Sequence, residues 1–403
     1  MELFWLEHKK LWRKKIVKIC VLLCFVYYVI FGSILLFQWF GFGSSDDYTS
    51  AFGNNFDGYT VIKDSQEYAL SFGGELTDET LQQIVSDYQQ MEADGMEEEL
   101  EKTDWQIVNS WLGTLYPELR DTSNYKTMIS YVDPDKLTGF YERRQQVLDE
   151  FLEVSGQVGA EKEYLHQIER KVEKPFRYEW VEGWSTLLGS MVADLGVVMA
   201  LFLGIVLSSL FAGEWHDNTS TLVLTTRNGW GKIALAKILT GLAFTVELFA
   251  LLAVSSVISQ LFFMGTAGWD MPIQNIKLIA VAPMNMLQAE IYEYAFVLLG
   301  AIGFAGIVMF ISAAVKNNVL TLLLSLAVVY GPMMIAEYLP YGMQKALDLI
   351  PLVGSSTDIF RTNTFRIFGK LIWSPYLLIT IPVLIGILCM PFAIKSWSRR
   401  MKA

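Results

Sequence analysis

The polar segment 211–232 contains the residues whose types and spacing best suit a mechanical or chemical role. Glu214 is followed by Asn218 and Thr219, either of which can cap a short helix. The residues that such a helix would carry onward are Leu222, Leu224, Thr225 and Arg227. The pattern predicts a short amphipathic helix over 215–226 that crosses the ends of two longer helices. Such a helix is a suitable lever for another protein to push.

The chain lacks the groupings that catalysis or nucleotide hydrolysis needs. His8, His166 and His216 are scattered, without a second ligand at zinc spacing. No G-x-x-x-x-G-K-[S/T] motif occurs, so the backbone cradle and lysine that hold phosphates are missing. No nucleophile, base and acid group together either. We therefore predict no catalytic site, no metal site and no cofactor in this chain.

Two acidic residues fall inside apolar stretches, where each costs roughly 2–3 kcal/mol or more on insertion scales. Asp194 and Glu247 therefore face either a pathway for a cationic or amphipathic substrate, or a hydrogen-bond partner on a neighbouring helix. The sequence leaves both readings open. Glu290, Glu293 and Glu337 lie near the ends of apolar stretches and are expected at the membrane interface.

Six apolar stretches are the elements that must position these residues. Each is long enough for a helix to cross a hydrocarbon layer of ~30 Å, which takes ~20 residues. Hydrophobic residues make up 53% of the chain, which suits a protein surrounded by lipid. The stretches occupy residues 16–40, 186–212, 236–263, 291–315, 319–337 and 373–394. The predicted fold class is an all-α polytopic membrane protein with six transmembrane helices.

The charges divide between the membrane part and one large insert. Residues 41–183 hold 30 of the 42 acidic residues and 12 of the 31 basic residues, a net charge of −18, and the remainder carries +7. This acidic insert is a compartment signal and not a nucleic-acid signal. Basic residues before span one and after span six place both termini in the cytoplasm and the insert outside. Basic residues in the outer loop 338–372 oppose this orientation, and the termini outweigh them.

The insert 41–183 is predicted to be a mainly helical domain with its own small core. Thr77 is the expected N-cap of one helix, and Asp133-Pro134 is the expected start of another. Trp180 and Trp184 precede span two and are expected in an outer aromatic belt. The predicted helices cover about 77–103, 104–117, 134–154 and 159–173.

Two further patterns concern the N-terminus and the small residues of the spans. Residues 1–15 mix aromatic, aliphatic and basic residues, which favours an interfacial elbow helix over an ordinary flank of span one. Cys20 and Cys24 share a helix face, where packing is favoured over a metal pair. The insert has no cysteine, which suits a bacterial plasma membrane. Glycines that share one side of span four indicate close helix packing; they are Gly300, Gly303 and Gly306.

Together these features resemble the permease subunits of ABC-2 type exporters. That family combines an elbow helix, six spans, an outer insert between spans one and two, and a Glu-x-x-x-(Gly/Asn)-Thr/Ser-…-Leu-x-Leu-x-Thr-…-Arg motif after span two. The residues at the motif positions here are Glu214, Asn218, Thr219, Leu222, Leu224, Thr225 and Arg227. Asn218 replaces the usual Gly, and the Pro common after the Thr pair is absent. The resemblance covers about 1–40 and 184–400.

The resemblance implies a transport subunit that works only within an assembly. Helix 215–226 would be a coupling helix that docks on a separate cytoplasmic ABC ATPase subunit, which would bind ATP and Mg. A second permease subunit, identical or paralogous, would complete the pathway. The expected cargo is amphipathic: a peptide, a lipid-like molecule or a drug. The outer domain would be a lid, a collector of cationic peptide or a docking site for an accessory protein.

Two other classes of function are compatible with the sequence. One is a membrane sensor or scaffold whose outer domain binds a ligand and whose loop 213–235 signals inward. The other is an ion-coupled secondary transporter with Asp194 and Glu247 as proton sites, although the repeated halves usual in such proteins are not found. Dependence on an ATPase subunit distinguishes the ABC-type exporter from both.

Overall fold

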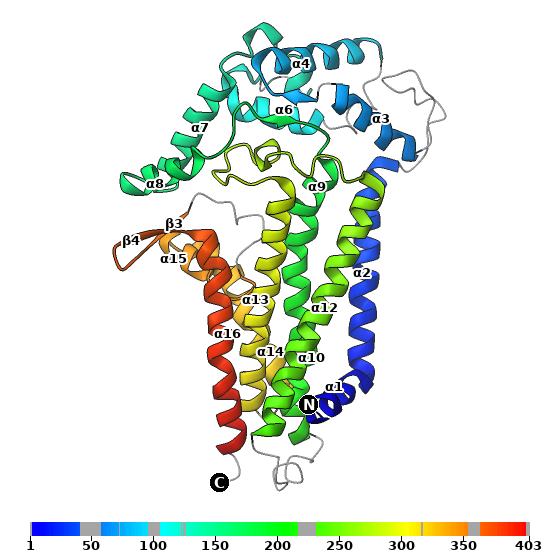
Figure 1. Ribbon diagram of the computed structural model, residues 1–403, viewed down its shortest axis with the longest axis vertical. Helices are drawn as coiled ribbons and strands as arrows, with labels where there is room; N and C mark the ends of the chain where they lie inside the picture. Colours follow the sequence, from blue (N-terminus) through cyan, green and yellow to red (C-terminus); the bar gives the residue numbers. More distant parts are fainter. Residues whose placement is uncertain are drawn as a thin grey trace.

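The chain folds, in a computed structural model, into a bundle of long apolar helices with a smaller helical domain at one end (Figure 1). Six helices in the described part are long and apolar enough to cross a membrane. The predicted helical fold with six candidate spans is therefore confirmed. The structure describes residues 2–40, 58–71, 73–95, 105–121, 123, 126–216, 231–315, 317–353 and 363–399.

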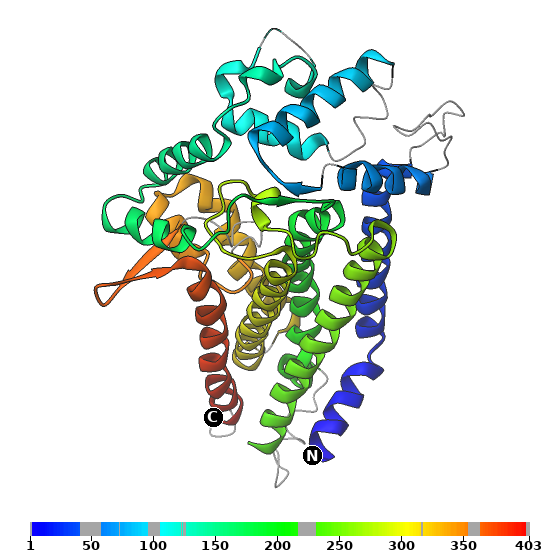
Figure 2. The ribbon, with the colours of Figure 1, turned by 45° about the horizontal axis from the view of Figure 1, so that its top comes forward.

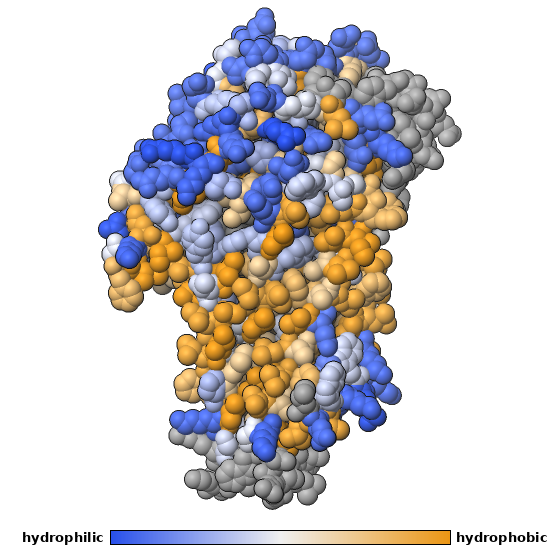
Figure 3. Space-filling view, in the orientation of Figure 1, coloured by the Kyte–Doolittle hydropathy of each residue, from blue (hydrophilic) through white to orange (hydrophobic). Residues whose placement is uncertain are grey.

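The six helices alternate in direction along the bundle (Figure 1). The first helix α1 and the C-terminal end of α16 lie at one end, here named the terminal end. The inserted domain lies at the opposite, domain end. A broad apolar surface covers the helices below the hydrophilic surface of that domain (Figure 3). The helices are α2 (Lys15–Phe40), α10 (Val192–His216), α12 (Lys232–Met264), α13 (Met286–Ala314), α14 (Asn318–Ile335) and α16 (Ser374–Arg399).

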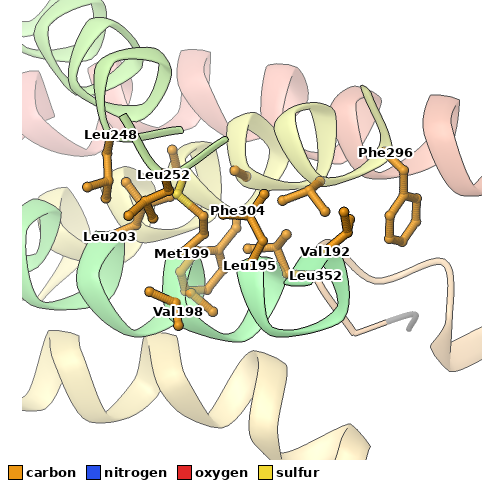
Figure 4. Close-up of a cluster of buried hydrophobic side chains, with 14 of the residues drawn as sticks. Val192, Leu195, Val198, Met199, Leu203, Leu248, Leu252, Phe296, Phe304 and Leu352 are labelled. Atoms are coloured by element: carbon orange, nitrogen blue, oxygen red, sulfur yellow. The ribbon is translucent and has the colours of Figure 1, made fainter. Parts of the chain in front are cut away.

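Helices α10 and α13 form the centre of the bundle. Of their spans, 67% and 61% are buried, against 17% for the span of α14 at the periphery. A helix that is apolar on every side suits such a central place. Side chains from four segments meet in one cluster (Figure 4), including Val192, Leu195, Met199, Leu203, Leu248, Leu252, Phe296, Phe304 and Leu352.

The glycines of α13 allow close contact with α16, as predicted. A Cβ added at Gly303 would lie 2.3 Å from the carbonyl oxygen of Pro382. One added at Gly306 would lie 2.4 Å from the carbonyl oxygen of Gly386. The two backbones therefore approach with no room for a side chain between them.

Helix α1 (Glu2–Arg13) forms within the predicted N-terminal segment and packs against α12. Leu11 is buried, and the Trp12 and Phe244 ring centroids are 5.8 Å apart. Trp5, on the outward side, is 62% exposed. Cys20 and Cys24 are buried in α2, in keeping with a packing role, and the described residues include no group of three or more His, Cys, Asp or Glu that could hold a metal.

Residues 58–181 contribute the inserted domain, which has a hydrophobic core of its own. Leu81, Trp105 and Phe140 lie in that core, and Leu278 joins it from the connecting segment 265–285 between α12 and α13. The elements of the domain are α3 (Gly58–Ser71), β1 (Gly74–Glu75), α4 (Asp78–Ala93), α6 (Trp105–Leu115), α7 (Phe140–Val154), α8 (Ala160–Glu169) and β2 (Arg177–Tyr178).

Several predicted boundaries in the inserted domain were wrong. Helix α3 was not expected, and α4 ends at Ala93, although Thr77 caps it as predicted. The helix expected from 134 begins at Phe140 instead, because Gly139 adopts a left-handed conformation with φ of 72°. Asp78 stabilises that start from another helix: its carboxylate accepts the Gly139 and Phe140 N–H groups at 2.7 and 2.9 Å.

The expected aromatic belt at the start of span two was also wrong. Trp180 and Trp184 are only 1% and 5% exposed. The Trp184 indole donates to the Ala267 carbonyl at 2.9 Å, and the Trp180 indole donates to the Met264 carbonyl at 3.2 Å. Trp180 therefore binds the last residue of α12, Trp184 binds the connecting segment that follows it, and neither faces lipid. Helix α9 (Glu182–Thr186) and a π turn (Leu187–Met191) lead from here into α10.

The loop 338–372 contains a short helix and a β-hairpin. Helix α15 (Tyr341–Leu347) follows α14, and β3 (Thr364–Ile367) pairs with β4 (Lys370–Trp373). The hairpin contacts the inserted domain (Figure 2), because Arg366 pairs with Glu161 at 2.6 Å. Thr364 also donates to the buried Gln157 side chain at 2.7 Å.

A buried ion pair fastens the inserted domain to the connecting segment 265–285. The guanidinium of Arg144 contacts Glu169 at 2.6 Å and donates to the carbonyls of Leu278 and Ala280 at 2.7 and 3.1 Å. Burial alone raises the pKa of the Glu169 carboxyl. Hydrogen bonds from Lys174 and Arg144 outweigh that effect, and the pKa is lowered overall.

We expect Gly303→Ala to destabilise the protein by about 1–3 kcal/mol, because the new methyl group meets backbone that cannot move aside. Gly331→Ala, in the open face of α14, is the matched control and should be neutral or slightly stabilising. Thermal unfolding of the purified protein in detergent measures both. Equal melting temperatures for the two variants would contradict the close packing of α13 and α16.

We expect Glu169→Gln to reduce stability near neutral pH by about 3 kcal/mol, because Arg144 then stays buried without its charged partner. The folded pKa of Glu169 is lowered, so its stabilisation is present above the ordinary value of 4.5 and is lost as the pH falls below it. The variant should therefore show a weaker acid dependence of its melting temperature. Glu163→Gln, which removes an exposed pair with Arg170 at 3.3 Å, should change little.

Candidate functional site

A chain of four alternating charges lies at the terminal end of the bundle. Glu214, in the last turn of α10, accepts hydrogen bonds from Lys10 at 2.6 Å and from Lys237 at 2.8 Å. Lys237 also contacts Glu7 at 2.8 Å. Because Glu7 and Lys10 belong to α1 and Lys237 belongs to α12, the chain joins three helices. We name these four residues the ion chain.

Burial makes the ion chain a strong structural constraint. The side chains of Glu214 and Lys237 are 4% and 2% exposed, whereas that of Lys10 is 51% exposed. The inner pair lies away from water, where removing one partner of an ion pair costs about 3–5 kcal/mol because the other charge stays uncompensated. The end of α10 therefore cannot separate from α12 without breaking this pair.

Further contacts hold the same end of α10. The Ser312 hydroxyl of α13 accepts the N–H groups of Phe211 and Ala212 at 3.1 Å each and donates to the Ser208 carbonyl at 2.7 Å. The hydroxyl thus bridges the Ser208 carbonyl and the Ala212 N–H group, which are four residues apart in α10. Trp397 of α16 packs against Trp215, with ring centroids 6.1 Å apart. Four helices, α1, α12, α13 and α16, therefore contact the last turns of α10.

The remaining residues of the predicted coupling motif cannot be placed in this arrangement. Asn218, Thr219, Leu222, Leu224, Thr225 and Arg227 lie outside the described residues. Of the predicted helix 215–226, only Trp215 and His216 lie among the described residues, and they belong to α10. Lys232 begins α12, four residues before the predicted start of the third span at 236. Of the motif, the structure thus places Glu214 at the end of α10, held by α1 and α12.

The two acids expected inside the spans contact different helices. Asp194 of α10 accepts the Tyr27 hydroxyl of α2 at 3.3 Å. Glu247 of α12 accepts the Trp12 indole N–H at 3.0 Å and lies 3.2 Å from His8 of α1. No hydrogen bond or ion pair joins the two acids within the described part of the chain. Their contacts fit hydrogen bonding between helices, and a role in a pathway stays a prediction.

Two further acids are buried inside the protein. Glu290 and Glu293 are 3% and 0% exposed, and their position at the membrane interface stays a prediction. Their carboxylate oxygens make no hydrogen bond of ordinary geometry among the described residues. The Tyr294 hydroxyl, next to Glu290 on the same helix, pairs with Ser256 at 2.6 Å. The packing of α13 against its neighbours buries this stretch.

Sequence reasoning missed the partners of Glu214. From the sequence, Lys10 and Lys237 are only basic residues beside membrane spans, where they help to set the orientation of the chain in the membrane. A signal was available, because Lys237 stands five residues inside the apolar helix α12 and a lysine in that place requires a partner. Glu7 and Lys10 are one turn apart in α1, so they share a face that can meet it.

Comparison of the chain with protein-family models, curated proteins and solved structures gives no match. The function of the chain must therefore be inferred from its own sequence and structure. Six candidate spans around a central helix pair make the chain a multi-pass membrane protein.

Lys237→Met should lower the free energy of unfolding by about 3–5 kcal/mol, because Glu214 and Glu7 then lose their shared buried cation. Lys232→Met, at the exposed start of α12, is the matched control and should change stability by less than about 0.5 kcal/mol. Thermal unfolding in detergent distinguishes the two. An unchanged melting temperature in Lys237→Met would show that the ion chain does not hold the helices together.

Proposed function

We propose that this chain is the permease subunit of an ABC-type exporter, driven by ATP hydrolysis on a separate ATPase subunit. The proposal rests on the ion chain, which ties Glu214 to α1 and α12. The segment 217–230 joins α10 to α12, and both helices are tied to α1 by the ion chain. A push on that segment would therefore reach three helices at once.

The architecture supports the same role. A helix precedes the first span, a folded domain separates spans one and two, and both ends of the chain lie at the terminal end (Figure 1). In the proposed topology the terminal end is cytoplasmic, α1 is the elbow helix at the inner leaflet, and the inserted domain is outside. The ATPase docks on 213–235, and a second permease chain, identical or paralogous, completes the transport pathway.

The cargo class follows from the proposed pathway and from the inserted domain. The apolar bundle suits an amphipathic cargo, such as a peptide, a lipid-like molecule or a drug. The domain keeps an acidic surface outside the membrane, which attracts cationic molecules at modest ionic strength. It also offers a surface for an accessory protein.

Co-purification with an ABC ATPase subunit tests the proposal. Leu222→Asp and Leu224→Asp should each abolish co-purification and the ATPase activity that depends on it, because a charge would enter an apolar docking surface. Val158→Asp, an exposed position in the inserted domain, is the matched control and should leave both unchanged.

One result would reject the docking assignment. If both leucine variants assemble with the ATPase and hydrolyse ATP like the wild type, segment 217–230 is not the coupling element. Assembly of wild type with no ABC ATPase would favour a membrane sensor or scaffold instead.

A second candidate function is favoured by one observation. Glu290 and Glu293 are buried in a span without a hydrogen bond of ordinary geometry among the described residues, and buried acids of this kind mark ion and proton pathways in transporters. An ion-coupled secondary transporter would use them, alongside Asp194 and Glu247. Substrate uptake or efflux in proteoliposomes that follows an imposed proton gradient without nucleotide would support this rival.

A further inference from the structure

A cavity of about 430 Å³ lies between the inserted domain and the connecting segment 265–285. Helix α6 contributes Ile107 and Ser110 to its wall, and α7 contributes Phe151. The connecting segment contributes residues 275–280, and α9 contributes Glu182 and Ser185. These elements lie at the domain end of the bundle, where the apolar surface meets the hydrophilic domain (Figures 1 and 3).

The wall of this cavity carries one cation, Lys277. Lys277 makes no ion pair within 4 Å and no side-chain hydrogen bond with any residue that the structure describes, and its charge acts at longer range on the buried Glu293 of α13. Glu182, the other charged residue of the wall, already has an interaction. The remaining lining is neutral, and Ile107, Phe151 and Ile279 make part of it apolar. The cavity therefore combines a positive group with an apolar surface.

The wall is held in place before any ligand binds. The Arg144 guanidinium donates to the carbonyls of Leu278 and Ala280, on either side of Ile279. The Trp111 indole donates to the Asn275 carbonyl at 2.8 Å. Asn275 is fully buried, and its side-chain oxygen has no hydrogen-bond partner among the described residues. An unpaired buried acceptor of this kind is costly unless something else satisfies it.

We propose that this cavity binds an anionic phospholipid from the adjoining membrane leaflet, with the phosphate on Lys277. The volume is within the range of small-molecule sites and exceeds what a bare phosphate needs. The first carbons of the acyl chains contact Ile107, Phe151 and Ile279, and a head-group hydroxyl supplies the donor that the Asn275 side chain lacks. The site is independent of the proposed transport function, because no ATPase subunit takes part in it.

Binding of fluorescent short-chain phosphatidylglycerol to the full-length protein in phosphatidylcholine nanodiscs tests the proposal. Lys277→Gln should weaken binding by about tenfold, because a charge-assisted hydrogen bond is lost. Lys277→Arg should retain it. Ser110→Trp, which fills the cavity from the exposed side of α6, should weaken binding by a similar factor.

Two control variants repeat the loss of a lysine charge and the gain of a tryptophan side chain at positions outside the cavity. Lys136→Gln removes an exposed lysine of the same domain, and Ser86→Trp adds the same bulk to an exposed serine of α4. Both should bind like the wild type. Phosphatidylglycerol binding that is unchanged in both Lys277→Gln and Ser110→Trp would overturn the proposal.

Two comparisons separate lipid from other ligands. A fluorescent phosphatidylcholine of the same chain length should bind the wild type at least about tenfold more weakly, because it carries no net charge. Equal binding of the two lipids would reject the role of Lys277. Inorganic phosphate at millimolar concentration should not displace the anionic lipid, and complete displacement would show a phosphate site in place of a lipid site.

Discussion

In the low-polarity interior of a membrane protein, a buried charge is costly unless an opposite charge lies beside it. The ion chain meets this requirement by alternating sign from Glu7 to Lys237, Glu214 and Lys10. Its consequence is mechanical, because the charges belong to three helices and can stay paired only if those helices move together. The position of α1 against the bundle and the end of α10 both depend on it.

The same constraint operates at the domain end, with a different result. Arg144 and Glu169 form a buried pair inside the inserted domain, and the guanidinium has donors left over for the carbonyls of the connecting segment. The domain is thus fastened to the segment from which α13 starts. Since α12 runs from the terminal end to that segment, the ion chain lies at one end of α12 and the Arg144 pair lies beside the segment that follows its other end.

Local signals in the sequence were accurate where the chain's neighbours do not alter them. The six spans follow from apolar length alone, and Thr77 caps α4 because its hydroxyl meets a free N–H three residues later. Asp133-Pro134 was misleading because neighbouring residues do alter the local signal there. It starts only a short 3₁₀ turn, since Gly139 reverses the backbone and Asp78, distant in sequence, supplies the cap of α7.

The sequence by itself determined the number and approximate location of the spans, the helical character of the insert and the small face of α13, because these depend on hydropathy, capping and side-chain size along one element. Only the tertiary structure decided the partners of Glu214, the burial of Glu293 and the location of Trp180 away from lipid. Each of these depends on which helices lie side by side. A single charged or aromatic residue is compatible with water, lipid or a distant partner until packing selects one of them.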